Sequence, residues 1–370
     1  MNATYTKAEF VEFYQQVGIE IGRLCNAKCE HCITYSGPKN KEKMDPEMLR
    51  RVIREGASVG LAHIELTGGE PFLFLDELEE IVRYAKSFGM ATGITTNSTW
   101  ATSPQRAVKI LTRLKDAGLI RLRFSIDQYH LNYIPLERVE TAVQAALDVG
   151  VYPIIEAAVG RKDYRAYNAI HKLKMFRTEL KVSELLPFGR AAEFDQSTFF
   201  TESFYEVAHT PCQYAGIPVV ENDGRVLLCC TYPVAQDPND LDSPFVLGHV
   251  NQESLATILA RHLYNPLLRV LRYEGPGGLL RVLEEKYGDK QYKPRPNYPG
   301  SICTLCADMM DHVNFRKLWH ETVVEHDLTA WSAPPENFDQ VAAQEATIGA
   351  TSARYRSLPI VSMDCADSQR

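Results

Sequence analysis

Residues 25–32 of this chain read CNAKCEHC, which places Cys25, Cys29 and Cys32 within eight residues. Cysteines at this spacing suit half of a disulfide set, a zinc site, or a metal group that keeps one coordination position open. The chain has nine cysteines, an odd number, and most of them fall in tight clusters. This arrangement favours metal ligation over a disulfide framework.

Length and composition restrict the class of protein. The chain has 370 residues, of which 45% are hydrophobic, enough for one large domain or two smaller ones. The formal net charge of −7 argues against a general binder of nucleic acid or membrane surfaces. No run of about 18 apolar residues exists, and the start, MNATYTKAEFVEFYQQ, lacks a secretory pattern. We therefore expect a cytoplasmic protein with reduced thiols, no membrane segment and no nucleic-acid partner.

Apolar runs alternate with amphipathic helical stretches from about residue 17 to residue 190. The expected strands cover residues 17–22, 62–67, 91–96, 120–126, 151–159 and 182–188. The stretches between them, such as PEMLRRVIREGASVG, have apolar residues at helical spacing and end at a glycine suited to a C-cap. Six such units predict an α/β fold with a parallel sheet, arranged as an open, partial (β/α)6 barrel.

The pattern changes after residue 190. The segment IPVVENDGRVLLCC predicts a β-hairpin around Asn222-Asp223-Gly224, and SPFVLGHV could add a strand. Residues 251–275 and 279–289 and a stretch that opens near Cys303 are expected to be helical. We expect a barrel domain over residues 1–190, an α+β domain over 191–328, and a loosely structured tail over 329–370.

CNAKCEHC follows the first expected strand and therefore lies at the carboxyl end of the sheet, where open α/β folds place their sites. A structural zinc site would need a fourth ligand. No fourth cysteine is near, and His31 lies between two of the cysteines and would have to fold back. Three thiolates at a four-iron cluster would leave one iron open to a non-protein ligand.

The C-x3-C-x2-C spacing after the first strand of a partial barrel resembles the signature of the radical S-adenosylmethionine (SAM) enzymes, with His31 at the family's aromatic position. The resemblance implies that Cys25, Cys29 and Cys32 bind a [4Fe–4S] cluster whose open iron binds SAM. In that family the reduced cluster cleaves SAM to methionine and a 5′-deoxyadenosyl radical, which abstracts a hydrogen from the substrate.

A glycine-rich motif one strand later carries the same resemblance. Gly68, Gly69, Glu70 and Pro71 are similar to the family's motif for the SAM amino group. Two glycines let the backbone approach a ligand closely, and a carboxylate can accept a hydrogen bond from an ammonium group. Taken alone, these four residues also suit an ordinary strand-to-helix turn.

The ends of the later strands add candidate SAM contacts. By resemblance, polar residues here contact the SAM ribose and carboxylate, which makes candidates of Thr96, Asn97, Ser125 and Asp127. A helix cap is the alternative role for Asp127. The segment LPFGRA after the sixth strand is also similar to the family and implies that Arg190 lies near the adenosine or the substrate.

A second cysteine set occurs in the C-terminal half. Cys212 precedes the hairpin, Cys229 follows its glycine in a G-x4-C spacing, and Cys303 and Cys306 form a C-x2-C pair. This set resembles the SPASM/twitch extension of radical SAM enzymes, and in the shorter twitch form it implies one auxiliary [4Fe–4S] cluster closed by four thiolates. A four-cysteine zinc site is the alternative by ligand chemistry.

Cys230 adjoins Cys229, and neighbouring residues of a strand point to opposite faces, so the spacing favours Cys229 as the ligand. Cys230 is then a buried small hydrophobe or a thiol hydrogen donor of the kind used by radical epimerases. Cys365 lies in the expected tail, and we expect no catalytic role for it. Arg190 and Glu156 are further catalytic candidates, whereas Tyr129 and His130 are expected to pack or to cap.

The resemblance implies a radical SAM oxidoreductase of a natural-product pathway that oxidises or epimerises a small polar metabolite. Oxidation, crosslinking or epimerisation of a ribosomally made peptide is the alternative. It is less favoured because only about 16 residues precede the first strand, too few for a peptide-recognition domain. A non-catalytic iron–sulfur electron carrier is a further alternative, against which GGEP and TTN argue. An electron donor such as flavodoxin or ferredoxin is an expected partner.

Overall fold

The structure is a computed structural model that describes residues 14, 16–176, 178–229, 240–263, 265–288 and 292–323. The expectations for Cys230, Cys365 and the tail over residues 329–370 fall outside these described residues.

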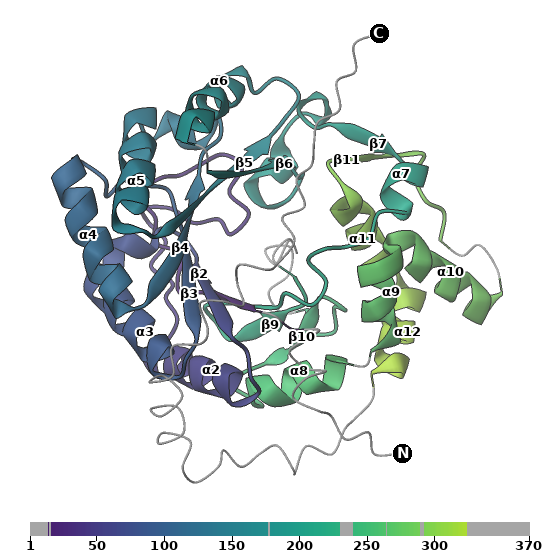
Figure 1. The fold of residues 1–370 in the computed structure, drawn as a ribbon. Helices are drawn as coiled ribbons and strands as arrows, with labels where there is room; N and C mark the ends of the chain where they lie inside the picture. The colour runs from purple at the N-terminus through teal and green to yellow at the C-terminus, as the bar shows by residue number, and fades with distance from the viewer. Residues whose placement is uncertain are drawn as a thin grey trace.

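A nine-stranded sheet forms the wall of an open barrel, with strand order β10-β9-β8-β1-β2-β3-β4-β5-β6 (Figure 1). Six of these strands are parallel and follow the chain order, namely β1 (Val17–Glu20), β2 (His63–Thr67), β3 (Ala91–Thr96), β4 (Leu119–Ser125), β5 (Tyr152–Val159) and β6 (Glu179–Glu184). The prediction of a partial barrel with a parallel sheet is confirmed.

The sixth strand lies earlier than the predicted residues 182–188. It covers Glu179–Glu184, and Val182 on this edge strand is exposed. The apolar run that suggested the later boundary, residues 185–188, leaves the sheet and lines the cavities described below. The apolar run was thus read correctly as buried, but it is buried next to the cavities and is not part of the sheet.

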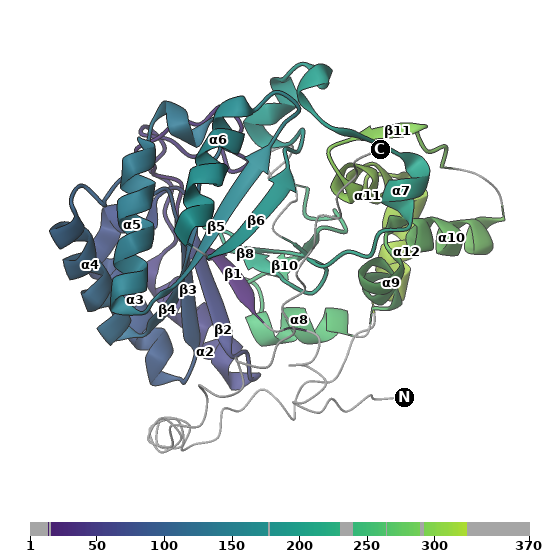
Figure 2. The same ribbon diagram turned by 45° about the horizontal axis from the view of Figure 1, so that its top comes forward.

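Five helices cover the outer face of the barrel (Figures 1 and 2). They are α2 (Pro46–Ser58), α3 (Leu75–Ser87), α4 (Pro104–Ala117), α5 (Leu136–Val149) and α6 (Tyr164–Leu173). Side-chain caps begin two of them: Asp45 accepts from the backbone N–H groups of Glu47 and Met48, and Ser103 accepts from that of Arg106. Each helix buries one apolar stripe, as the helical spacing predicted.

The C-terminal part combines a hairpin with a group of helices. The predicted hairpin is present as β8 (Val219–Val220) and β9 (Arg225–Leu227), and β10 (Val246–His249) pairs with β9. The other elements are β7 (Thr201–Ser203), α7 (Phe204–Ala208), α8 (Leu255–Leu263), α9 (Pro266–Glu274), α10 (Pro276–Tyr287), β11 (Asn297–Pro299), α11 (Ile302–Met310) and α12 (Val313–Thr322). Helices α7 and α9–α12 gather on the side of the molecule opposite α4 (Figures 1 and 2).

The hairpin is a continuation of the barrel sheet, because β8 pairs in parallel with β1. Charged side chains strengthen this junction. Arg23, just after β1, binds Glu20 at 2.9 Å and the hairpin residue Glu221 at 3.3 Å, and Glu221 also binds Arg225 at 2.8 Å. Both glutamates are buried, and burial raises the pKa of each, that of Glu221 to about 8, against the effect of the arginines. The start of the cysteine loop is therefore tied to the hairpin.

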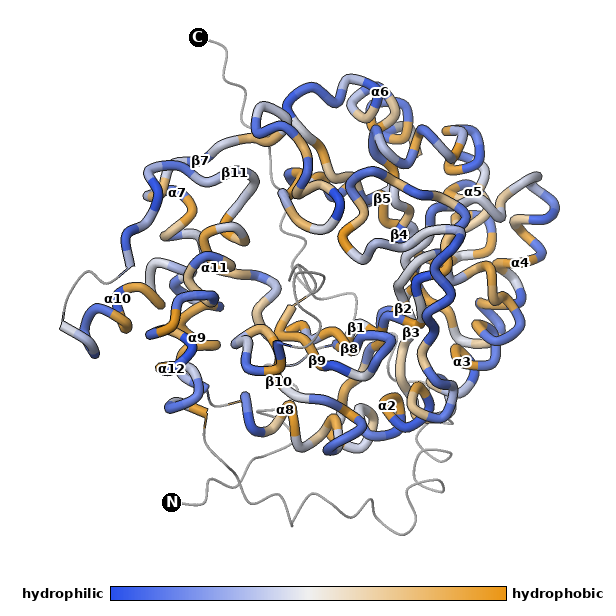
Figure 3. Tube along the Cα trace, turned by 180° about the vertical axis from the view of Figure 1, so that it is seen from behind, coloured by the Kyte–Doolittle hydropathy of each residue, from blue (hydrophilic) through white to orange (hydrophobic). Residues whose placement is uncertain are grey.

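The main core is apolar and runs from the barrel strands into the helices of the C-terminal part. A small second cluster, Ala157, Val159, Ala166 and Ile170, lies between β5 and α6. Figure 3 shows hydrophobic segments along β1, β8 and β9 and alternation of hydrophobic and hydrophilic segments along the surrounding helices. Among the described residues, no helix combines the length and the hydropathy needed to cross a membrane.

Candidate functional site

A large cavity lies at the carboxyl ends of the barrel strands. Its empty volume is about 1120 Å³, including the space at its mouth. The cysteine loop, the glycine-rich turn and the ends of β3–β6 all contribute to it. Of the residues predicted from the sequence, those that line it are Cys25, Cys29, Cys32, Gly68, Gly69, Thr96, Asn97, Ser125 and Arg190.

The three cysteines of the loop fit a metal cluster with an open position. Cys25 and Cys29 are buried and Cys32 is partly buried, yet all three face the cavity. Burial raises the pKa of Cys25 to about 11 and that of Cys29 well above its usual range. A nearby cation would reverse this effect, because thiolates are the form that binds metal. The free side of the loop then opens toward the cavity, where a ligand of the cluster would bind.

The glycine-rich turn is fastened to the chain that enters the cysteine loop. The backbone N–H of Gly69 donates to the carbonyl of Gly22 at 2.7 Å, and that of Glu70 donates to Leu24 at 2.9 Å. A Cβ atom on Gly69 would lie 2.1 Å from the Leu24 carbonyl oxygen, so only glycine fits there. Gly68 and Gly69 thus bring the second strand and the cysteine loop together at the cavity.

Glu70 faces the protein rather than the cavity. Its carboxylate accepts from the backbone N–H of Asn97 at 2.7 Å, from the Thr96 hydroxyl at 2.8 Å and from the backbone N–H of Phe72 at 3.1 Å. Burial raises its pKa to about 7, against the effect of these donors. Pro71 is buried at the start of a 3₁₀ turn, Pro71–Phe74. Glu70 therefore joins the ends of β2 and β3 and holds Thr96 and Asn97 at the cavity.

We expect Glu70→Ala to lower the free energy of unfolding by about 2–4 kcal/mol, because it leaves buried N–H groups without an acceptor. Chemical denaturation of the anaerobic protein measures this loss. Glu285→Ala is the matched control, since Glu285 forms an exposed ion pair with Arg281 and the loss of such a pair should change stability by less than about 1 kcal/mol. Equal effects of the two substitutions would contradict the role given to Glu70.

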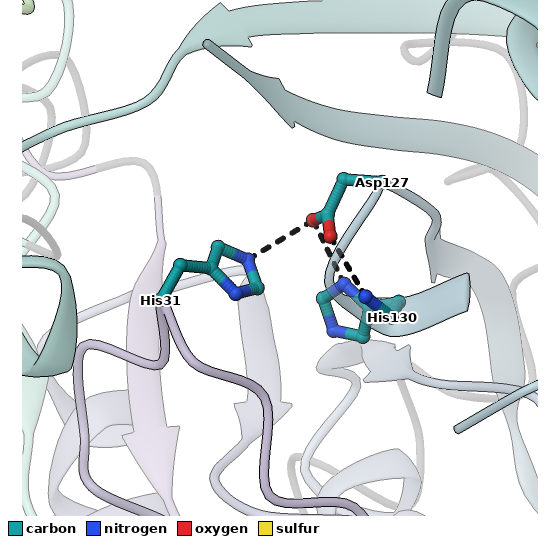
Figure 4. Close-up of side chains that lie close together, drawn as sticks. All are labelled: His31, Asp127 and His130. Carbon is teal, nitrogen blue, oxygen red and sulfur yellow. Dashed lines mark hydrogen bonds and ion pairs between the residues drawn. The ribbon is translucent and has the colours of Figure 1, made fainter. Parts of the chain in front are cut away.

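A group of two half-buried histidines and one buried aspartate lies beside the cavity (Figure 4). Asp127 binds His31 Nε2 at 3.0 Å and His130 Nδ1 at 2.8 Å through the same oxygen. Its other oxygen accepts from the backbone N–H groups of Tyr129 and His130, as in a helix cap. Asp127 therefore contacts protein groups and does not line the cavity, whereas His31 and His130 do.

The pKa shifts in this group favour an ion pair between Asp127 and His130. The two histidines hold the pKa of Asp127 well below its usual range despite its burial. Burial acts to lower the pKa of His130, but Asp127 outweighs it and the pKa is raised. The three residues could also hold a metal ion. In a metal site, His31 would bind the ion through Nε2, and its protonated Nδ1 would be buried with no acceptor among the described residues. The cost of that unpaired donor favours the hydrogen-bonded arrangement.

Arg190 binds the cysteine loop directly. Its guanidinium group donates to the carbonyl of Cys29 at 2.9 Å and to that of Ser36 at 2.8 Å, and its backbone N–H donates to Cys32 at 3.1 Å. The preceding Gly189 has φ +57°, and a Cβ there would lie 2.4 Å from the Ile33 Cα. The segment after β6 is thus packed against the cysteine loop, and Arg190 holds that loop through hydrogen bonds.

We expect Arg190→Met to weaken retention of the metal cluster that Cys25, Cys29 and Cys32 would hold. Two carbonyls of the cysteine loop would each lose a charged hydrogen bond worth about 1.5–3 kcal/mol. Iron content after anaerobic gel filtration measures this. Arg165→Met on α6 is the control, because the Arg165 guanidinium donates hydrogen bonds to residues 131 and 132, away from the cysteine loop. Full iron content with lost substrate turnover would instead favour the catalytic role that the sequence suggested for Arg190.

Glu156, another catalytic candidate, is not among the residues that line the cavity. It binds Arg123 at 2.6 Å, and Arg123 also binds Glu65 at 3.1 Å. Ser125 and the end of β3 do reach the cavity, and the Thr96 hydroxyl also accepts from Trp100 Nε1 at 2.9 Å. Sequence reasoning missed the pairing of His31 with Asp127; the histidine at an aromatic position was the available signal.

The second cysteine set surrounds a separate cavity with an empty volume of about 420 Å³. Cys212, Cys229, Cys303 and Cys306 line it together with apolar side chains. Burial, followed by the proximity of the other three sulfurs, raises the pKa of Cys306 well above its usual range. Four sulfurs gathered in an apolar cavity fit a metal group that balances their charge. The fold thus brings together cysteines that lie up to 94 residues apart in the chain, from residue 212 to residue 306.

Comparison with known families defines the class of protein. Residues 19–155 match the radical SAM superfamily, and residues 212–278 match the SPASM iron–sulfur cluster-binding domain. The chain therefore contains a radical SAM domain followed by a SPASM-type iron–sulfur domain. These domains imply a SAM-binding [4Fe–4S] cluster, SAM, and auxiliary iron–sulfur binding. Cys303 and Cys306 lie beyond the matched residues, although the fold brings them to Cys212 and Cys229.

Two curated relatives and one solved structure are similar to this chain. A putative peptide biosynthesis protein, YydG of Bacillus subtilis, is 23% identical over 310 residues, covering 81% of this chain and 93% of that protein. A probable GTP 3′,8-cyclase of Pyrococcus horikoshii is 27% identical over 195 residues, covering 50% of this chain and 60% of that protein. The structure of anSMEcpe with bound AdoMet and the Kp18Cys peptide has a TM-score of 0.50 and 16% identity, covering 83% of this chain and 99% of that one. It supports the fold alone.

Proposed function

We propose that this chain is a radical SAM enzyme that modifies a ribosomally made peptide. The observation that carries the proposal is the likeness to the peptide biosynthesis protein, which extends over 93% of that relative, whereas the likeness to the GTP cyclase covers 60% of the cyclase. Similarity over the whole of a relative includes its substrate-binding parts. Similarity limited to part of a relative can come from shared cofactor chemistry alone.

The surroundings of the large cavity suit an extended peptide. Beside it runs β6, the edge strand of the barrel sheet, with Lys181, Val182 and Ser183 exposed. An edge strand offers unpaired backbone groups to which an extended peptide can add. Ser183 and the following Glu184 lead from this edge into the cavity.

The residues of the site divide into two tasks. Cys25, Cys29 and Cys32 would hold the cluster to which SAM binds, with Gly68, Gly69, Thr96, Asn97 and Ser125 around the bound SAM. The bound cluster and SAM supply hydrogen-atom abstraction. Arg190, Glu70 and Asp127 would hold these groups in place, and Cys212, Cys229, Cys303 and Cys306 would hold one auxiliary cluster. We assign the barrel to residues 1–190 and the auxiliary domain to 191–328.

The test is co-expression with each short peptide encoded next to this gene, followed by mass spectrometry and chiral analysis of the peptide. Oxidation or crosslinking removes two hydrogens, and epimerisation keeps the mass but introduces deuterium from heavy water. We expect one of these changes, dependent on SAM and on a reduced flavodoxin or ferredoxin. A set of neighbouring peptides that all remain unchanged, beside an enzyme that turns over a metabolite, would overturn the proposal.

A small polar metabolite is the second candidate substrate, and a single observation favours it. The described residues gather the auxiliary cysteines at one cavity, which suits the short twitch form with one closed cluster. Formation of 5′-deoxyadenosine with sugars, aminocyclitols or nucleosides, measured beside the peptide assay, decides between the two. For an oxidation, one 5′-deoxyadenosine per oxidised product is expected.

A further inference from the structure

The two cysteine cavities share one lining residue. Phe188 lines the large cavity beside Cys32 and Arg190, and it also lines the auxiliary cavity beside Cys212 and Cys306. Its side chain is buried, with 7% of its surface exposed. A residue that contributes to both walls lies between the two spaces.

The backbone holds Phe188 firmly in this position. Leu185 leaves the sheet with its N–H still bonded to the carbonyl of Val159 at 2.8 Å. On the other side, Gly189 packs against Ile33, and Arg190 is bonded to the cysteine loop as described above. The carbonyl of Phe188 accepts from the backbone N–H of Ala191 at 3.1 Å. Phe188 is thus fixed from both flanks.

The two cavities on either side of Phe188 are lined by different kinds of side chain. The wall of the large cavity mixes polar and apolar groups, whereas the auxiliary cavity is lined by sulfurs and by apolar side chains such as Leu228, Phe245 and Leu271. Solvent exposure and burial are among the main factors that set the reduction potential of an iron–sulfur cluster. An aromatic ring between such spaces excludes water and keeps substrate atoms from the auxiliary sulfurs.

We propose that Phe188 is the partition between the two cysteine cavities and keeps the auxiliary cluster closed to water and to substrate. The proposal depends on the assignment of the four auxiliary cysteines, and it is independent of the identity of the substrate. Phe188 is a positioning residue in this role, because it shields a bound group and takes part in no bond change.

The test uses the full chain with Cys25, Cys29 and Cys32 replaced by alanine, so that only auxiliary iron remains. Phe188→Ala and Phe188→Leu are compared in this background, with Phe199→Leu as the control. Phe199 is fully buried but lines neither cavity. The readouts are the rate of iron removal by a chelator, the midpoint reduction potential from an anaerobic titration, and the thermal midpoint.

We expect Phe188→Ala to speed iron removal by about tenfold or more and to shift the reduction potential, with a smaller change for Phe188→Leu. Phe199→Leu should lower the thermal midpoint without changing either cluster readout. If Phe188→Ala does not fold, the comparison of the two leucine variants decides. Equal chelation rates and potentials in these two variants would overturn the proposal. A background variant without iron would overturn the cysteine assignment and the partition with it.

Discussion

Replacing Cys25, Cys29 and Cys32 together by alanine will abolish the formation of 5′-deoxyadenosine while iron remains bound to the chain. The three sulfurs line the large cavity and have no substitute there, because no other described cysteine lies in that wall. Without them no iron is available to bind SAM. The four remaining described cysteines lie around the second cavity and keep their own ligand set.

The measurement is an anaerobic assay of 5′-deoxyadenosine with dithionite, together with iron and zinc analysis of the purified variant. If the two clusters are of equal size, about half of the iron should remain. The reciprocal control replaces Cys212, Cys229, Cys303 and Cys306 by alanine and should lose the other half. Persistent SAM cleavage in the first variant would refute the assignment of the loop. Zinc without iron would refute the auxiliary cluster in favour of a zinc site.

Asp127→Asn will lower the free energy of unfolding by about 3–5 kcal/mol, the range for breaking a buried charge pair by removing one partner. Asp127 is buried and serves His31, His130 and two backbone N–H groups at once. An asparagine in this place carries no charge and directs either an oxygen or an NH₂ group at the histidines. Asp116→Asn, an exposed position on α4, is the control and should change stability little.

The effect of Asp127→Asn depends on pH in a direction fixed by the pKa shifts. The pKa of Asp127 is lowered, so its contribution is present above its usual range near pH 4 and is lost only as the pH falls further. The pKa of His130 is raised from about 6.5, so its contribution is full below that pH and is lost as the pH rises through the folded value. The stability gap between the wild type and the variant should therefore be larger at pH 6 than at pH 8.5. Denaturation curves at both pH values measure it, and a constant gap would contradict the coupling.

Local sequence patterns predicted the barrel because they depend on neighbouring residues. The strands at 63–67, 91–96 and 152–159 and the helices between them follow from hydrophobic spacing and glycine caps. The loop CNAKCEHC and the turn GGEP were informative because cofactor chemistry restricts both residue type and spacing. Their position at one cavity follows from the parallel sheet, which brings the carboxyl ends of its strands together.

Contacts between distant segments could not be predicted in the same way. Nothing local shows that β8 pairs with β1, or that β7 pairs with β11. The same limit applies to the site: Arg190 was predicted near the cavity, but its bonds to the carbonyls of residues 29 and 36 depend on how β6 ends. The sequence therefore indicated which groups belong to the site, but the contacts that each of them makes depend on the fold.

The pairing of β1 with β8 has a consequence for the order of events during synthesis. β1 ends at residue 20, and its partner on one side, β8, begins at residue 219. The ribosome makes about 5–20 residues per second, so this edge of β1 is without its partner for roughly 8–30 seconds after β2 has been made. An open strand edge invites pairing with other chains. During that interval this edge of β1 is open, and pairing with β8 of the hairpin closes it.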